Sequence, residues 1–109
     1  MAESKLREQS MDFAVKIVKT CGNIKGHYSL VNQLERSATS IGANIREANY
    51  AHGKADFIAR LQIALKESYE AECWMELVSA EQMRPLYNQC GMIRRMLVAS
   101  INTAKKTVK

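Results

Sequence analysis

The sequence is short of helix breakers, aromatic residues and long apolar runs. Its 109 residues include one proline, five glycines and 6% aromatic residues. Scarce breakers favour long helices, and short β-branched runs argue against a β-sandwich or barrel. No apolar run approaches the ~20 residues that cross a bilayer, and residues 1–10 lack the apolar segment of a signal peptide. We therefore expect one all-α domain over residues 1–109, located in the cytoplasm.

Residues that could support catalysis are equally sparse. Cys21, Cys73 and Cys90 are widely spaced and form no CxxC pair, which is typical of buried free thiols. His27 and His52 fall in predicted loops, and neither has a glutamate three residues before it, as a di-metal bundle site requires. No glycine-rich phosphate loop is present. We expect no enzyme activity, cofactor or metal, although a small hydrolase or metal enzyme remains as a third alternative.

Apolar residues recur at spacings of three and four along nearly the whole chain. This periodicity is that of amphipathic helices, and several stripes approach the heptad spacing of helix bundles. Ser10 interrupts the first stripe. Short connections join the helices, so the pattern predicts an up-and-down antiparallel four-helix bundle. The predicted helices cover about residues 5–21, 28–49, 54–80 and 85–105.

Local signals suggest where these helices begin and end. Gly22 follows the last periodic residue of the first helix, where a cap with positive φ is expected. Ser29 is a candidate cap for the second helix. Pro85 suits the first turn of the fourth helix because its missing N–H needs no partner there.

The middle of the second helix, residues 37–48, has an unusual composition. It is rich in small and polar residues, including Ser40, Gly42 and Asn44, which are mediocre helix formers. Small side chains let two helix backbones approach closely, and hydroxyl and amide groups can link helices. We interpret this stretch as the hub of the packing, where the bundle core and a subunit contact could meet.

The excess positive charge of the chain is concentrated near its end. Residues 83–109 contain six basic residues and no acidic residue, whereas the whole chain has a formal charge of +5. A segment of one sign indicates a polyanionic partner, although a solvated basic face is an equal alternative. The candidate phosphate contacts are Arg84, Arg94, Arg95, Lys105 and Lys106, with Lys16 and Lys19 as possible additions.

Two apolar strips lie off the predicted core. Ile63, Trp74 and Leu77 lie roughly opposite the core stripe of the third helix, and Met92 and Met96 form a smaller strip on the fourth. An exposed apolar strip favours an oligomer interface, and tryptophan is a frequent interface anchor. The alternative is that the third helix packs on two sides within its own bundle.

Polar residues recur at helical spacing beside these strips. They could form two solvated edges, or a partly buried network between helices or subunits in which Arg36 or Arg46 pairs with Glu67 or Glu70. The residues concerned are Arg36, Ser40, Asn44, Arg46, Glu47, Glu67 and Glu70.

Three segments together resemble a known family. They are Ser40-Ile41-Gly42-Ala43-Asn44-Ile45-Arg46-Glu47-Ala48, then Lys54-Ala55-Asp56-Phe57-Ile58, then Ile63-Ala64-Leu65-Lys66-Glu67 with Glu70 and Trp74. The pattern, which covers about residues 34–77, resembles the four-helix-bundle proteins of the 23S rRNA intervening sequence (S23-like) type. Many members carry proline at the position of Gly42, so we do not expect a strong kink here.

The resemblance implies a bundle that assembles into a homo-oligomer, typically a pentamer, with no established enzyme activity. A related accessory protein of diversity-generating retroelements is a basic pentamer that binds nucleic acid and a reverse transcriptase. By analogy, RNA or DNA and a reverse transcriptase-like protein are possible partners here. We expect a homo-oligomer that binds the backbone of structured RNA or DNA. The alternative is a protein–protein adaptor with no nucleic-acid role.

Overall fold

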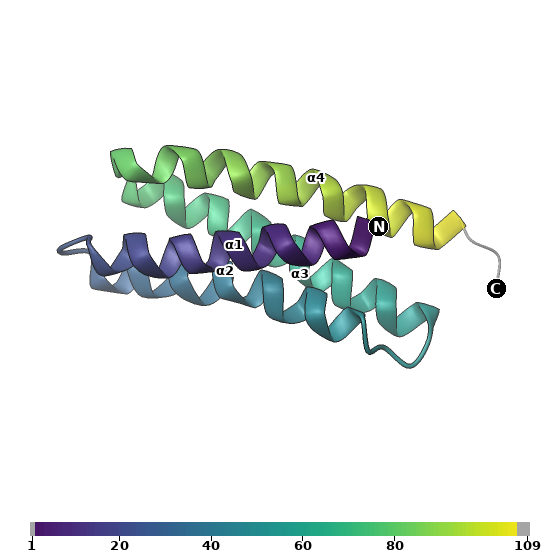
Figure 1. Cartoon of the computed structure of the whole chain (residues 1–109). Coiled ribbons are helices and arrows are strands. Elements are labelled where there is room, and N and C mark those ends of the chain that lie inside the picture. The colour runs from purple at the N-terminus through teal and green to yellow at the C-terminus, as the bar shows by residue number, and fades with distance from the viewer. Residues whose placement is uncertain (1, 107–109) are drawn as a thin grey trace.

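The computed structural model describes the backbone of residues 2–106 and the side chains of residues 5–106. Four long helices follow one another: α1 (Ala2–Gly22), α2 (Tyr28–Ala48), α3 (Lys54–Val78) and α4 (Arg84–Lys106), with a short 3₁₀ helix, η1 (Glu81–Met83), before α4. They run up and down in an elongated bundle of 49 × 20 × 19 Å (Figure 1). The predicted fold class is confirmed.

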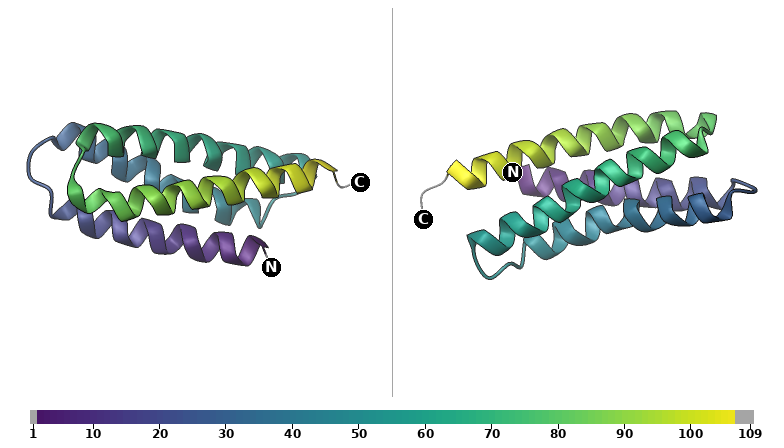
Figure 2. Two further views of the ribbon diagram at one scale, coloured as in Figure 1. Left: turned by 90° about the horizontal axis from the view of Figure 1, so that it is seen from above. Right: turned by 180° about the vertical axis from the view of Figure 1, so that it is seen from behind.

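Each helix contacts the next in the chain, and α1 closes the bundle against α4. Consequently α1 and α3 occupy opposite corners, as do α2 and α4 (Figure 2). The last turns of α4 extend past the beginning of α1 (Figures 1 and 2). Within residues 2–106, no helix combines the length and apolar character needed to cross a membrane.

The predicted apolar stripes form one continuous core. Its largest fully buried side chains come from all four helices. Burying a side chain of this size contributes ~1.5–3 kcal/mol. These residues are Leu6, Phe13, Ile17, Leu34, Ile41, Ile45, Leu61, Ile93 and Leu97.

Ser10 belongs to the core although its polarity seemed to interrupt the stripe. It is 1% exposed, and its hydroxyl donates to the Arg7 carbonyl at 3.0 Å. A serine can be buried in a helix in this way because the backbone one turn earlier satisfies its hydroxyl. Met83 of η1 is a second core residue that the periodicity did not identify.

The helix pair α2–α3 has the most extensive contact in the bundle. Its buried surface consists largely of small residues: Ser37 and Ala38 on α2, and Ala64, Ser68 and Ala71 on α3. Ser37 and Ser68 donate their hydroxyls to carbonyls of their own helices, at 3.0 Å (Gln33) and 2.6 Å (Leu65). Small side chains bring the two backbones close, so this part of the packing-hub interpretation agrees with the structure.

The chain reverses at other residues than expected. Gly22 remains in α1, and Asn23 and Ile24 continue with tight turns onto Thr20 and Cys21. The positive φ angles of this loop are at Gly26 (83°) and His27 (53°). His27, and not Ser29, precedes α2, and it makes no side-chain cap. The cap predictions at Gly22 and Ser29 were therefore wrong.

The α3–α4 junction also differs from prediction. The third helix ends at Val78, earlier than the expected Ala80, because Ser79 adopts the left-handed conformation (φ 55°) and its N–H bonds to the Met75 carbonyl. The fourth helix begins one residue before Pro85, directly after η1, so the proline does lie in its first turn.

Candidate nucleic-acid and assembly surfaces

The basic residues of α4 are distributed along its whole length. Arg84, Arg95, Lys105 and Lys106 are all exposed, and no acidic residue occurs in α4. Lys106 lies 22 positions after Arg84, so at 1.5 Å per residue the two are about 33 Å apart along the helix. These four side chains, which we call the α4 basic strip, thus form a long line of charge and not a compact patch. Lys109, the last basic residue of the segment, lies outside the described residues.

Arg94 differs from the other basic residues of α4 because α3 holds it. Its Nε donates to Glu72 Oε2 at 2.8 Å, and its guanidinium lies over the Tyr69 ring, 5.4 Å from the centroid. The side chains of Arg94 and Glu72 are only 28% and 13% exposed. The hydrogen bond to Glu72 raises the pKa of Arg94 further. Arg94 therefore links α3 to α4, while its neighbour Arg95 faces solvent.

The remaining basic candidates are more exposed than Arg94 and make weaker ion pairs or none among the described residues. Lys16 pairs with Asp12 at 2.9 Å, and Asp12 also accepts a hydrogen bond from Gln89 of α4 at 2.9 Å. The Gln89 bond and then Lys16 lower the pKa of Asp12. Arg84 lies 3.9 Å from Glu81, with both side chains largely exposed, so the pair contributes little. Lys19 is exposed on α1.

The polar edge of α2 faces α3, although its contacts differ from the expected pairs. Glu47 pairs with Arg60 of α3 at 2.9 Å, and Arg60 was not among the predicted residues. Asn44 donates to the Ser40 carbonyl at 3.0 Å. Arg60 Nε also lies 3.8 Å from Asp56 Oδ1. These two residues are four positions apart on α3, and this spacing could have identified Arg60 as a paired residue from the sequence.

The expected arginine–glutamate pairs do not form within the described chain. Neither Arg36 nor Arg46 makes an ion pair with Glu67 or Glu70 there. Arg36 is nevertheless close enough to act on Glu67. The pKa of Glu67 is raised, first by burial and then by Glu70, against the opposing effects of Lys66 and Arg36. This carboxylate therefore has less stabilisation than an isolated glutamate in water.

The predicted apolar strips separate into exposed and packed residues. Ile63 and Leu77 are 38% and 58% exposed on the outer face of α3. Trp74 and Met96 instead pack against the bundle core, and Met92 is half-buried. The Trp74 indole N–H is inaccessible to solvent and has no hydrogen-bond partner in the described structure. Ile63 and Leu77 are thus the residues of this set that are most available for a subunit contact.

A third apolar strip, on α1, was not identified from the sequence. Met11, Val15 and Val18 are 44%, 46% and 46% exposed. Their spacing of four and three was visible in the sequence. The core stripe predicted for the same helix obscured it, because the helical spacing from Ala14 to Val18 places Val18 on that stripe. This strip borders a groove between α1 and α2 that is lined by Met11, Ala14, Thr39, Gly42, Ala43, Arg46 and Glu47.

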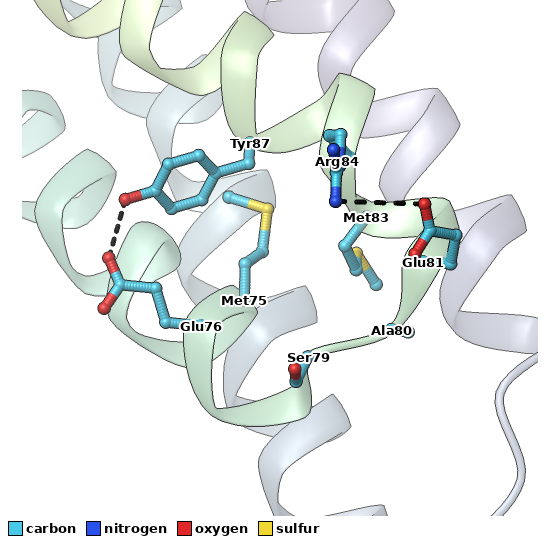
Figure 3. Close-up of a pocket in the computed structure, with 8 residues that line it drawn as sticks. All are labelled: Met75, Glu76, Ser79, Ala80, Glu81, Met83, Arg84 and Tyr87. Atoms are coloured by element: carbon cyan, nitrogen blue, oxygen red, sulfur yellow. Dashed lines mark hydrogen bonds and ion pairs between the residues drawn. The ribbon is translucent and has the colours of Figure 1, made fainter.

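A pocket lies where α3, η1 and α4 meet (Figure 3). Two buried methionines, Met75 and Met83, form part of its wall. The Tyr87 hydroxyl donates to Glu76 at 2.6 Å, which raises the pKa of the tyrosine. The pocket lining includes Ser79 and the carboxylates of Glu76 and Glu81, and no histidine or cysteine. Across residues 5–106, no three metal-ligating side chains come together.

Comparison with solved structures gives a close relative. The crystal structure, at 1.70 Å, of a protein of unknown function from the S23 ribosomal protein family of Bacteroides thetaiotaomicron VPI-5482 superposes with a TM-score of 0.87. The two sequences are 38% identical, and the alignment covers 94% of this chain and 99% of that one. A search of curated proteins found no match.

The family comparison agrees with this structural similarity. Residues 2–99 match the model of the 23S rRNA-intervening sequence protein family, which spans all of α1, α2 and α3 and most of α4. The match extends beyond residues 34–77, which carried the sequence resemblance, to the helices α1 and α4. The chain belongs to the 23S rRNA-intervening sequence protein family.

Proposed function

We propose that this protein is a non-enzymatic homo-oligomer, a pentamer, that binds the backbone of structured RNA or DNA through the α4 basic strip. The observation that carries this proposal is the separation of roles on α4. Glu72 holds Arg94 in the bundle, whereas Arg95, Lys105 and Lys106 have no ion pair among the described residues. Exposed, unpaired cations along one helix suit phosphate contacts that read no sequence.

The length of the strip supports a duplex as the ligand. Its ~33 Å is close to one helical turn of B-DNA, ~34 Å. Single-strand binding would in addition require exposed aromatic side chains interleaved with the cations, and Tyr87 is the one aromatic residue of α4. A ring of five protomers would repeat the strip five times, so weak contacts would add up as avidity.

Salt dependence tests the proposal directly. Fluorescence anisotropy would follow binding of 30-base-pair RNA and DNA duplexes between about 50 and 300 mM salt. Each phosphate contact contributes about −0.9 to the slope of log K against log salt for DNA. Four contacts per protomer therefore predict a slope of about −3.6 or steeper. Arg95→Gln should reduce the slope by about 1. Lys25→Gln, an equal charge change in the α1–α2 loop, is the matched control.

Two results would contradict the proposal. Absence of binding at ~50 mM salt would exclude the nucleic-acid role and leave the strip to an acidic protein, which is the adaptor alternative. Equal effects of Arg95→Gln and Lys25→Gln would show that net charge, and not the α4 basic strip, determines binding. Size-exclusion chromatography with light scattering tests the assembly separately, because a monomer at tens of micromolar would exclude the pentamer.

A further inference from the structure

The outer face of α4 carries a regular alternation of cationic and amide side chains. At about 100° per residue, five exposed residues fall within a sector of about 40° around the helix axis. The row extends over about 33 Å along the helix, and an amide separates each cation from the next. We call this set the α4 outer row. It consists of Arg84, Asn88, Arg95, Asn102 and Lys106.

The helix surface between these side chains is low. Gly91 lies one turn before Arg95, and Ala99 lies one turn after it. A Cβ built at Gly91 would be 3.5 Å from Arg95 Nη1, so the guanidinium lies across the space that the glycine leaves. Because α1 and α3 pack against α4, its outer face is the one left open to a large ligand (Figure 2).

Carboxylates contact α4 on its flanks and at its first turn. On the flanks they accept hydrogen bonds in the pairs Glu72–Arg94, Glu76–Tyr87 and Asp12–Gln89. At the first turn Glu81 lies 3.9 Å from Arg84, and both side chains are largely exposed. Arg95 and Lys106 make no ion pair among residues 5–106. The positive charge of the row is therefore least compensated from its middle to its end.

The amides of the row suit a different ligand group from the cations. Asn88 and Asn102 make no side-chain hydrogen bond within residues 5–106. A phosphate oxygen accepts hydrogen bonds and suits arginine and lysine, whereas an asparagine amide both donates and accepts. A ribose 2′-hydroxyl also donates and accepts. RNA carries phosphates and 2′-hydroxyls along each strand, and DNA lacks the hydroxyls.

The position of the cations distinguishes an RNA duplex from the major groove of DNA. An α-helix can enter that groove, where asparagine binds the edge of adenine. Base edges then meet the middle of the helix and phosphates meet its flanks, so the cations should lie beside the amides. On α4 the cations and amides share one line. This arrangement suits the wide, shallow minor groove of A-form RNA, where hydroxyls and phosphates are reached across one surface.

We propose that the α4 outer row binds across the minor groove of an RNA duplex, with its three cations on phosphates and its two amides on ribose 2′-hydroxyls. Asn88 and Asn102 thereby select ribose over deoxyribose without reading the base sequence. This inference rests on the nucleic-acid binding proposed above and names the nucleic acid that is bound. It does not depend on the oligomeric state.

Three duplexes of one sequence test the selection of ribose. They are RNA, DNA and an RNA in which fluorine replaces every 2′-hydroxyl, which keeps the phosphates and the A-form geometry but removes the hydroxyl donor. Fluorescence anisotropy at low salt gives the Kd of each. RNA should bind about tenfold more tightly than the other two, because two hydrogen bonds of ordinary net strength together supply about that factor.

Variants separate the amides from the cations. Asn88→Ala combined with Asn102→Ala should weaken RNA binding about tenfold and DNA binding less than about twofold, with the salt dependence unchanged. Arg95→Gln should weaken both duplexes and reduce the salt dependence. Asn32→Ala, at an exposed position of α2, is the matched control for the loss of an amide. Circular dichroism should show folded helices in all variants, since alanine favours helix.

The possible failures of this inference and of the proposed function are distinguishable. Equal affinity for the three duplexes, or an RNA preference that the double alanine variant retains, would overturn the inference and leave nucleic-acid binding intact. Tighter binding of a particular DNA sequence than of RNA would also overturn it, because the amides would then read base edges. Absence of binding to every duplex at ~50 mM salt would overturn the proposed nucleic-acid role as well.

Discussion

Arg94 and Glu72 form the least exposed ion pair among the described residues, and they join α4 to α3 with an Nε–Oε2 distance of 2.8 Å. Because of this contact, Arg94 and its neighbour Arg95 have different environments. Arg94 is half enclosed and serves the bundle, whereas Arg95 is exposed and available to a ligand. Of these two adjacent arginines, Arg94 thus has a structural role and Arg95 is a candidate binding residue.

Removing this pair should lower the free energy of unfolding. Glu72→Ala should cost ~1–2 kcal/mol, because water can still reach part of Arg94. Arg94→Ala should cost more, ~2–3 kcal/mol, because it leaves the more buried carboxylate without a partner. Urea denaturation measures both. The control is Glu81→Ala, which removes the exposed pair with Arg84 and should cost less than ~0.5 kcal/mol. Equal effects for all three variants would contradict a structural role for Arg94.

Gly42 can accept a methyl group and should gain from it. A Cβ built at this position lies 3.5 Å from Ser10 Oγ, which is ordinary van der Waals contact. Alanine is the better helix former by ~1 kcal/mol, so Gly42→Ala should stabilise the fold by ~0.5–1 kcal/mol. Gly42 lines the groove between α1 and α2. Thermal denaturation of Gly42→Ala and of the wild type measures the change in stability. Gly26→Ala, at φ 83°, should instead cost ~1–2 kcal/mol, and a stabilising Gly26→Ala would refute this reading of the loop.

The helices were predictable from the sequence because their stripes obey one period. The apolar spacing located four helices, and the small residues of positions 37–48 indicated a close contact, which the α2–α3 packing provides. The loops were less predictable. The left-handed residue His27 has no sequence signal, since non-glycine residues seldom adopt positive φ. The reversal therefore came later than the glycine at position 22 suggested.

The candidate surfaces were predictable only in part, for a different reason. Exposure depends on which helix lies beside a residue, and periodicity along one helix does not contain that information. Thus the spacing predicts that Trp74 is on the outer face, but Trp74 packs against the core. The spacing predicts that Val18 is in the core, but Val18 is exposed. In the same way, the distinction between Arg94 and Arg95 required the position of Glu72 on the neighbouring helix.

The three cysteines should react at very different rates. Burial raises the pKa of Cys90 to about 12 and that of Cys21 to about 11, so neither forms appreciable thiolate at pH 8. Cys73 is exposed on α3. A thiol reagent should therefore modify one cysteine rapidly in the native protein and all three after denaturation. Cys73→Ser should abolish the rapid phase, and rapid reaction of a second thiol would contradict the burial of Cys21 and Cys90.

Stability should depend on pH through Glu67 and Asp12 in opposite directions. Burial and Glu70 raise the pKa of Glu67 above its ordinary value of 4.5, despite Lys66 and Arg36. The folded state then holds this proton more tightly, so the contribution of Glu67 is favourable at low pH and is lost as pH rises above 4.5. Glu67→Gln should remove that loss and raise stability at pH 7, by less than ~1 kcal/mol because water still reaches the carboxylate.

Asp12 provides the matched case of opposite sign. The Gln89 hydrogen bond and Lys16 lower its pKa below 3.8, so its contribution is present above that value and is lost as pH falls further. Asp12→Asn should therefore lower stability at pH 7, and its effect should become smaller as pH falls below 3.8. Melting temperatures of the two variants and of the wild type, measured from pH 3 to pH 7, test both signs. A Glu67→Gln variant that is less stable than its parent at pH 7 would show that Arg36 outweighs burial and Glu70 at this site.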